Sequence, residues 1–217
     1  YGNDFNRLRG TFMEFLHHLP FYGLAVLCVD DDEVRSLLPM IPRPVRTYGT
    51  STESDVRATG IRQERLRMHF TVQRRDAEGF PVVLNLPGRH NVLNALAAIC
   101  VGLELGVAED AIQRALAGFQ GVGRRFVVEE ITDSAGRDLI LVDDYGHHPR
   151  ELAATLEAAR QGWLRRRLVL VFQPHRFSRT QEQFEDFVKV LSSADVLVLT
   201  EVYPAGEVAI PGADGRS

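Results

Sequence analysis

The second half of the chain alternates strand patterns with helix patterns, and this alternation limits the possible folds more than any other feature. Strands that alternate with helices indicate a parallel sheet, because a crossover segment must return the chain before the next parallel strand begins. The sequence therefore predicts an α/β fold with a mostly parallel, Rossmann-like sheet after residue 123, incomplete at its end. We expect strands at 126–132, 138–142, 167–172 and 196–200, and helices at 149–160 and 181–191.

The first half of the chain has a different order of elements. The turn "RRDAEG" lies between two alternating segments and indicates a hairpin. Residues 39–55 carry three prolines at their head and are expected to form a loop. The glycine-rich "GFQGVGRRF" predicts a boundary between domains 1–123 and 124–217. We expect helices at 5–19, 31–38, 92–105 and 108–117, and strands at 24–29, 56–61, 66–72 and 82–86.

Composition excludes several classes of protein. The chain has 217 residues, a net charge of −4 and a pI near 6.0, which disfavours nucleic acid as a partner. The sequence carries no signal-peptide pattern and no apolar run that would span a bilayer. Cys28 and Cys100 lie in apolar runs and are expected to be buried free thiols in a reducing, cytoplasmic protein. The chain opens at Tyr1, and we take it to be part of a longer protein; oligomeric state is left open.

Two polar loops follow predicted strands in the second half. They are "DDYGHHP" at 143–149 and "QPHRFSRT" at 173–180. Ligands of open parallel sheets bind beyond the carboxyl ends of the strands, so we expect both loops at one edge. Arg176 and Arg179 are suited to grip a carboxylate, and His147 or His175 to hold or deprotonate an amine. Each motif alone is more often a solvated turn or a helix start, but two such loops at equivalent strand ends favour a site.

Two further motifs are candidates for a nucleotide site. In "GRHNVLN" at 88–94, Asn91 and Asn94 share a helix face, and their amides suit an adenine edge. The alternative is that Asn91 caps the helix. In "GVGRRF" at 121–126, Arg124 and Arg125 are placed to reach a phosphate; the alternative is a flexible linker with solvated charges. The adjacent pair at 17–18 points two imidazoles about 100° apart on a helix, so no metal site is predicted there.

The ordered set "GRHNVLN", "GVGRRF", "DDYGHHP" and "FQPHRFSRT" resembles the Mur ligase family along the whole chain. The resemblance implies peptidoglycan precursor synthesis: the carboxylate of UDP-N-acetylmuramate attacks ATP to give an acyl phosphate, and the amine of L-alanine displaces phosphate. Mg²⁺ and cationic side chains would offset the developing charge. The alternatives are a muropeptide-recycling ligase of the same family, which joins a tripeptide to UDP-N-acetylmuramate, and a non-catalytic nucleotide- or amino-acid-binding module.

The resemblance also implies roles for individual residues. Arg125 corresponds to the phosphate-contacting arginine that bridges the domains, and Asp144 to the aspartate near the ATP ribose. Arg125 and His147 are the predicted catalytic residues. The adenine side of the ATP site corresponds to His90, Asn91 and Asn94. The amino-acid pocket corresponds to Tyr145, His147, His175, Arg176 and Arg179, with the arginines on the alanine carboxylate.

The departure from the family pattern is an absence. No G-x-x-x-x-G-K-[ST] phosphate loop occurs in the sequence, and Lys189 in a late helix is the only lysine. The upstream glutamate and histidine expected to bind the metal are also missing. The resemblance therefore covers the C-terminal part of a central ATP-binding domain and most of a C-terminal ligase domain. We expect the fragment alone to be inactive.

Overall fold

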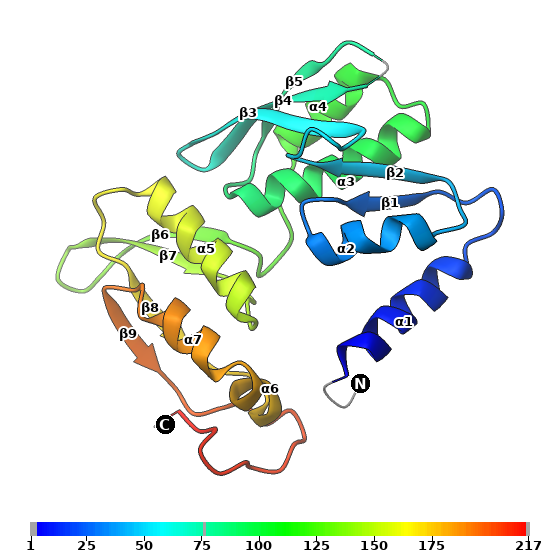
Figure 1. The fold of residues 1–217 in the computed structure, drawn as a ribbon. Coiled ribbons are helices and arrows are strands. Elements are labelled where there is room, and N and C mark those ends of the chain that lie inside the picture. The colour runs from blue at the N-terminus through cyan, green and yellow to red at the C-terminus, as the bar shows by residue number, and fades with distance from the viewer. Residues whose placement is uncertain (1–3, 76, 216–217) are drawn as a thin grey trace. The chain divides into compact units, whose positions relative to one another are not determined.

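The computed structural model describes residues 4–75 and 77–215 of the chain (Figure 1). The chain divides into two compact units, residues 1–119 and 120–217. Both units mix helices with sheets, so the predicted α/β class is confirmed.

The first unit is built on a five-stranded sheet with strand order β1-β2-β3-β4-β5 (Figure 1). The β1–β2 and β2–β3 pairs are parallel, whereas β3–β4 and β4–β5 are antiparallel. The predicted hairpin is therefore confirmed as β4–β5. The strands are β1 (Ala25–Cys28), β2 (Val45–Gly49), β3 (Val56–Glu64), β4 (Arg67–Arg74) and β5 (Phe80–Leu84).

The prediction that residues 39–55 form a loop is wrong, because they contain β2. Its four non-glycine residues are all half-buried, without the alternation that marks an amphipathic strand. β2 lies between two partner strands, so sheet pairing stabilises its backbone on both sides. The short 3-10 helix η1 (Leu38–Met40) precedes it, and the carbonyl of Pro44 accepts a hydrogen bond from Ala25 at 2.9 Å.

Four α-helices accompany this sheet. The carboxylate of Asp4 caps α1 and that of Asp31 caps α2, each accepting two backbone N–H groups of the first turn. The core lies between α3 and the sheet, where Leu96 and Val92 of the helix and Val72 of β4 are fully buried. The helices are α1 (Phe5–His17), α2 (Asp32–Leu37), α3 (Arg89–Glu104) and α4 (Glu109–Gly118).

The second unit begins with an antiparallel hairpin and continues with strands that alternate with helices. β8 and β9 pair in parallel, as the alternation predicts. The helix expected at 181–191 is two helices that Gln183 separates. The elements are β6 (Val127–Thr132), β7 (Asp138–Asp143), α5 (Pro149–Gly162), β8 (Val169–Phe172), α6 (Phe177–Glu182), α7 (Phe184–Leu191) and β9 (Val196–Leu199).

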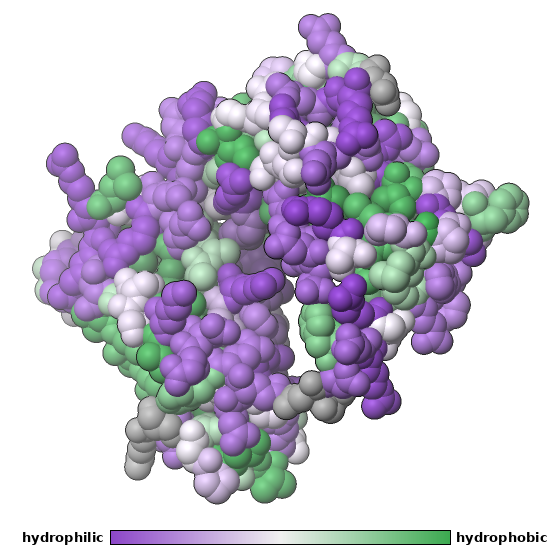
Figure 2. Space-filling view, viewed as in Figure 1, coloured by the Kyte–Doolittle hydropathy of each residue, from purple (hydrophilic) through white to green (hydrophobic). Residues whose placement is uncertain are grey.

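The core of the second unit lies where α5 and α7 pack on β8. Leu152, Phe172, Phe187 and Leu191 are buried there, and the two phenyl rings lie 5.6 Å apart. Apolar side chains of β9 remain exposed to solvent (Figure 2). Leu197, for example, is 40% exposed.

Asp195 ties α5 to the strands of this unit. Its carboxylate accepts two hydrogen bonds from the Arg160 guanidinium, at 2.8 and 2.9 Å, and one from the Leu168 amide at 2.7 Å. The Arg160 hydrogen bond and the Leu168 amide lower the pKa of Asp195 to about 2.

We expect Asp195→Asn to lower the unfolding temperature at pH 7 by several degrees. Because the folded-state pKa is depressed, the ionised contacts stabilise the fold above the ordinary carboxyl pKa of about 4. This contribution is lost as the pH falls towards 2. Thermal unfolding followed from pH 7 to pH 2 should therefore show the variant and the wild type converging in acid. A gap that stays constant across this range would contradict the assignment.

Candidate functional site

The two polar loops of the second unit meet. The ring of His147, from the loop after β7, lies 5.7 Å from the ring of His175, from the loop after β8. Tyr145 lies 5.3 Å from His147, and the Arg179 guanidinium donates to the His175 carbonyl at 3.3 Å. Among the described residues, β7 pairs with β6 and β8 with β9, so the loops converge although their strands are not hydrogen-bonded neighbours.

Asp144 holds the first loop in shape. One carboxylate oxygen accepts the Phe126 amide at 2.9 Å, and the other accepts the Gly146 amide at 2.7 Å. A Cβ at Gly146 would lie 2.8 Å from the same carboxylate, so the loop requires glycine there. The Tyr145 amide also donates to the Arg124 carbonyl at 2.8 Å. The "GVGRRF" segment is therefore tied to this loop by hydrogen bonds, and the expected ribose contact of Asp144 stays a prediction.

His147 is oriented by two acceptors on the same side of its ring. Its Nδ1 lies 3.0 Å from the Tyr145 carbonyl and 3.6 Å from a Glu151 carboxylate oxygen. Since both neighbours only accept hydrogen bonds, we assign a proton to Nδ1. Nε2 then carries the lone pair and is able to accept a proton.

Glu151 is the residue of this site that the sequence reasoning missed. Its carboxylate accepts the His147 amide at 2.9 Å and lies 3.8 Å from Arg125 Nη1. Desolvation raises the pKa of Glu151, but the His147 amide and the charges of His147 and Arg125 outweigh it, and the net shift is downward. Glu151 stands three residues after His148, the N-cap of α5, which is the capping-box spacing that could have revealed it.

Two arginines lie against the Tyr145 ring. The Arg124 guanidinium lies 4.6 Å from the ring centre and that of Arg125 lies 5.9 Å from it. Both arginines are exposed, at 65% and 51% of their side chains, and are accessible to an anionic ligand. Arg125 therefore stands beside the cluster, and its contact with a phosphate stays a prediction.

His175 differs from His147 in its surroundings. Its Nδ1 is buried and has no hydrogen-bond partner within the described part of the chain. Burial lowers the pKa of His175, and the positive charges of Arg179, His147 and Arg176 lower it further. His175 is therefore held neutral, as a ring that packs and accepts rather than as a charged donor.

The predicted adenine-site residues of the first unit lie at the start of α3. Gly88, with φ of 92°, is the N-cap and no side chain caps it, so the alternative that Asn91 is the cap is wrong. Asn91 instead donates to the Pro87 carbonyl at 2.7 Å and accepts from Asn94 at 3.3 Å. Asn94 is exposed, while His90 and Asn91 are half-buried. Their contact with a nucleotide stays a prediction.

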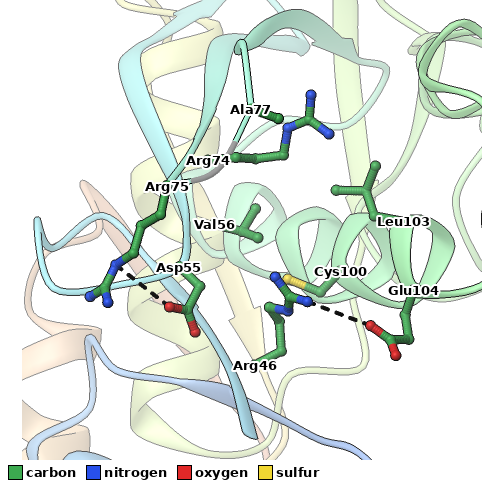
Figure 3. A pocket seen from close by; sticks show the side chains of 9 residues that line it. All are labelled: Arg46, Asp55, Val56, Arg74, Arg75, Ala77, Cys100, Leu103 and Glu104. Carbon is green, nitrogen blue, oxygen red and sulfur yellow. Dashed lines mark ion pairs between the residues drawn. The ribbon is translucent and has the colours of Figure 1, made fainter.

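A cavity of about 310 Å³ opens beside the C-terminal half of α3, away from these asparagines (Figure 3). Its charges are already paired: Arg46 lies 3.6 Å from Glu104, and Arg75 lies 3.5 Å from Asp55. Its floor includes Cys100, whose thiol pKa burial raises to about 12. We assign no ligand to it. The lining residues are Arg46, Asp55, Val56, Arg74, Arg75, Ala77, Cys100, Leu103 and Glu104.

Neither a metal centre nor a membrane segment is found in residues 4–75 and 77–215. No three side chains of His, Cys, Asp or Glu cluster there in a way that would hold an ion. None of the helices in these ranges has the length and apolar character needed to cross a bilayer. Both cysteines are free thiols, and Cys28 is half-buried rather than fully buried as predicted.

Comparison with known proteins gives matches along most of the chain. Residues 1–102 match the Mur ligase middle domain and residues 123–214 match the Mur ligase glutamate ligase domain. The whole chain is 59% identical to the UDP-N-acetylmuramate–L-alanine ligase of Methylococcus capsulatus and 62% identical to that of Halorhodospira halophila. It covers 46% and 45% of them, so it spans about half the length of these relatives.

A solved structure supports the same relationship. The UDP-N-acetylmuramate–alanine ligase MurC of Thermotoga maritima superposes with a TM-score of 0.73 at 30% identity. The match covers 94% of this chain and 43% of that one.

Proposed function

This chain belongs to the Mur ligase family, and from this we propose that it supplies the middle and C-terminal parts of an ATP-dependent ligase that joins L-alanine to UDP-N-acetylmuramate. The observation that carries the proposal is the convergence of His147, His175 and Arg179 from two separate loops. Two guanidinium groups and a neutral imidazole suit a small zwitterion, because they complement its carboxylate and its ammonium group respectively.

Both polar loops contribute residues to the proposed amino-acid pocket. Arg176 and Arg179 hold the carboxylate of L-alanine, and Tyr145 forms a wall beside His147. The ammonium group must lose a proton before its nitrogen can attack an acyl carbon. His147 takes that proton on Nε2, since its Nδ1 is occupied by the Tyr145 carbonyl. We assign this role to His147 rather than to His175, because burial and the neighbouring arginines lower the pKa of His175 and make its ring the weaker base.

The proposed ATP site uses residues of the motifs "GRHNVLN" and "GVGRRF", together with Asp144. ATP supplies the phosphoryl group that activates the muramyl carboxylate. Asn91 and Asn94 offer amide donors and acceptors to the adenine, with His90 beside them, and Asp144 lies on the ribose side. Arg125 offsets the charge that develops on the transferred phosphoryl group. Among the described residues, no three His, Cys, Asp or Glu side chains lie together as donors for Mg²⁺.

We propose a cytoplasmic location on the basis of the free thiols and the proposed substrates. Cys28 and Cys100 are free, which fits a reducing compartment, and both UDP-N-acetylmuramate and ATP are expected in the cytoplasm.

The test uses the full-length protein that carries this chain. ADP release should require UDP-N-acetylmuramate and L-alanine together. Release with a tripeptide but not with L-alanine would favour the recycling ligase. Binding of ATP or L-alanine without turnover would favour the non-catalytic module.

Replacing Asn91 with alanine should raise the KM for ATP about fivefold and leave the KM for L-alanine unchanged, since a lost hydrogen bond costs about 1 kcal/mol. Steady-state kinetics with each substrate varied in turn would measure both constants. Val101→Ala, on the same helix and 46% exposed, is the matched control. An unaltered KM for ATP would leave Asn91 only its structural bond to Pro87.

A further inference from the structure

The segment that follows β9 lies against the loop that carries His175 and Arg176. We call residues 203–207 the strap. The Arg176 amide donates to the Tyr203 carbonyl at 2.8 Å, and the Tyr203 amide donates to the Pro174 carbonyl at 2.8 Å. The Tyr203 ring lies 5.2 Å from the His175 ring. The strap therefore pairs with the loop through both backbone and side chain.

A tight turn then directs Glu207 back to the loop. The Glu207 amide donates to the Pro204 carbonyl at 2.9 Å. The two central residues have positive φ, 48° at Ala205 and 86° at Gly206. This is the pattern of a type I′ turn, which reverses the chain within four residues.

The Glu207 carboxylate supplies a cap that α6 otherwise lacks. It accepts the Ser178 amide at 3.0 Å and the Ser178 hydroxyl at 2.7 Å, and it lies 3.9 Å from Arg176 Nη1. Arg176 occupies the N-cap position but gives α6 no side-chain hydrogen bond. The Ser178 amide and hydroxyl lower the pKa of Glu207, so the carboxylate is ionised at neutral pH.

The backbone of Arg176 explains why such a support is needed. Its φ of 74° and ψ of 133° lie where L-residues are rarely found. A residue persists there only when neighbouring contacts hold it. The strap provides two of these contacts, one to the Arg176 amide and one to its guanidinium.

We propose that Glu207 is a positioning residue for the amino-acid pocket, which acts by fixing Arg176 and the start of α6 rather than by touching the substrate. The inference rests on the proposed function, because Arg176 is the carboxylate-binding arginine only if the pocket takes an amino acid.

The kinetic test compares Glu207→Ala and Glu207→Gln with wild type in the full-length protein. We expect Glu207→Ala to raise the KM for L-alanine at least tenfold and to leave the KM for ATP unchanged. Glu207→Gln keeps an oxygen that accepts from Ser178, so it should restore most of the affinity. Val208→Ala, the 87% exposed neighbour, should behave as wild type. An unchanged KM for L-alanine in Glu207→Ala, or equal rises for both substrates, would overturn the inference.

Amide hydrogen exchange separates this inference from the proposed function. The Ser178 amide should exchange faster in Glu207→Ala than in wild type, whatever the pocket binds. Should wild type fail to ligate L-alanine while Ser178 still loses protection in the variant, the proposed function fails and the strap contact stands. Unchanged protection of Ser178 would overturn the strap contact itself. Ser178→Ala, which removes only the hydroxyl donor, serves if Glu207→Ala does not fold.

Discussion

Replacing His147 with alanine in the full-length protein that carries this chain should lower kcat/KM for L-alanine by about 10²–10⁴-fold, the usual contribution of the general base that we propose it to be. The reason is geometric: the Tyr145 carbonyl and the Glu151 carboxylate both face Nδ1, which leaves Nε2 to take the ammonium proton. Steady-state rates measured with L-alanine varied at saturating ATP would show whether the variant has lost kcat/KM to this extent.

Two further histidine variants serve as comparisons for His147→Ala. His17→Ala changes an exposed histidine of α1 and should match wild type. His175→Ala should raise the KM for L-alanine and lower kcat less than His147→Ala does, because the pKa of His175 is lowered and its ring packs beside His147. A larger fall in kcat for His175→Ala than for His147→Ala would exchange the two roles.

Replacing Arg179 with alanine should raise the KM for L-alanine by about 10–100-fold and leave the KM for ATP unchanged, since hydrogen bonds to charged groups contribute about 1.5–3 kcal/mol. Arg179 stands one helical turn after His175 and donates to its carbonyl at 3.3 Å, which aims the guanidinium at the ring cluster. Initial rates with each substrate varied in turn would separate the two constants.

The matched variants for this arginine are Arg179→Lys and Arg165→Ala. Lysine keeps the charge but lacks the planar fork, so it should recover only part of the affinity. Arg165 is exposed on the loop after α5, so Arg165→Ala should leave both KM values unchanged. Equal rises in both KM values for Arg179→Ala would show that the amino-acid pocket is wrongly assigned.

Much of the fold follows from local pattern. The hairpin β4–β5 follows from alternation and turn residues, and the strands β6 and β7 follow from similar local signals. β2 was missed because its burial does not alternate, so only its pairing with β1 and β3 identifies it as a strand. The break at Gln183 between α6 and α7 was missed because the apolar periodicity of α7 continues to Leu191.

The site was predictable to the extent that it follows the rule for strand ends. That rule brought His147 and His175 together correctly. It gave no indication of Glu207, whose partner Ser178 is 29 residues away in sequence. It also gave no indication that the Asp144 carboxylate accepts the backbone amides of Gly146, in its own loop, and of Phe126; the ribose contact of Asp144 stays a prediction. Side chains that act on backbone groups leave little trace in a sequence pattern.

The position of Glu151 has a consequence for protein engineering. One carboxylate accepts the His147 amide, lies 3.6 Å from His147 Nδ1 and lies 3.8 Å from Arg125 Nη1. A redesign that shifts the loop to admit a bulkier amino acid would also displace the arginine assigned to the phosphoryl group. Under the proposed function we expect substrate range and turnover rate to be linked, so a library that varies the loop should vary Arg125 and Glu151 with it.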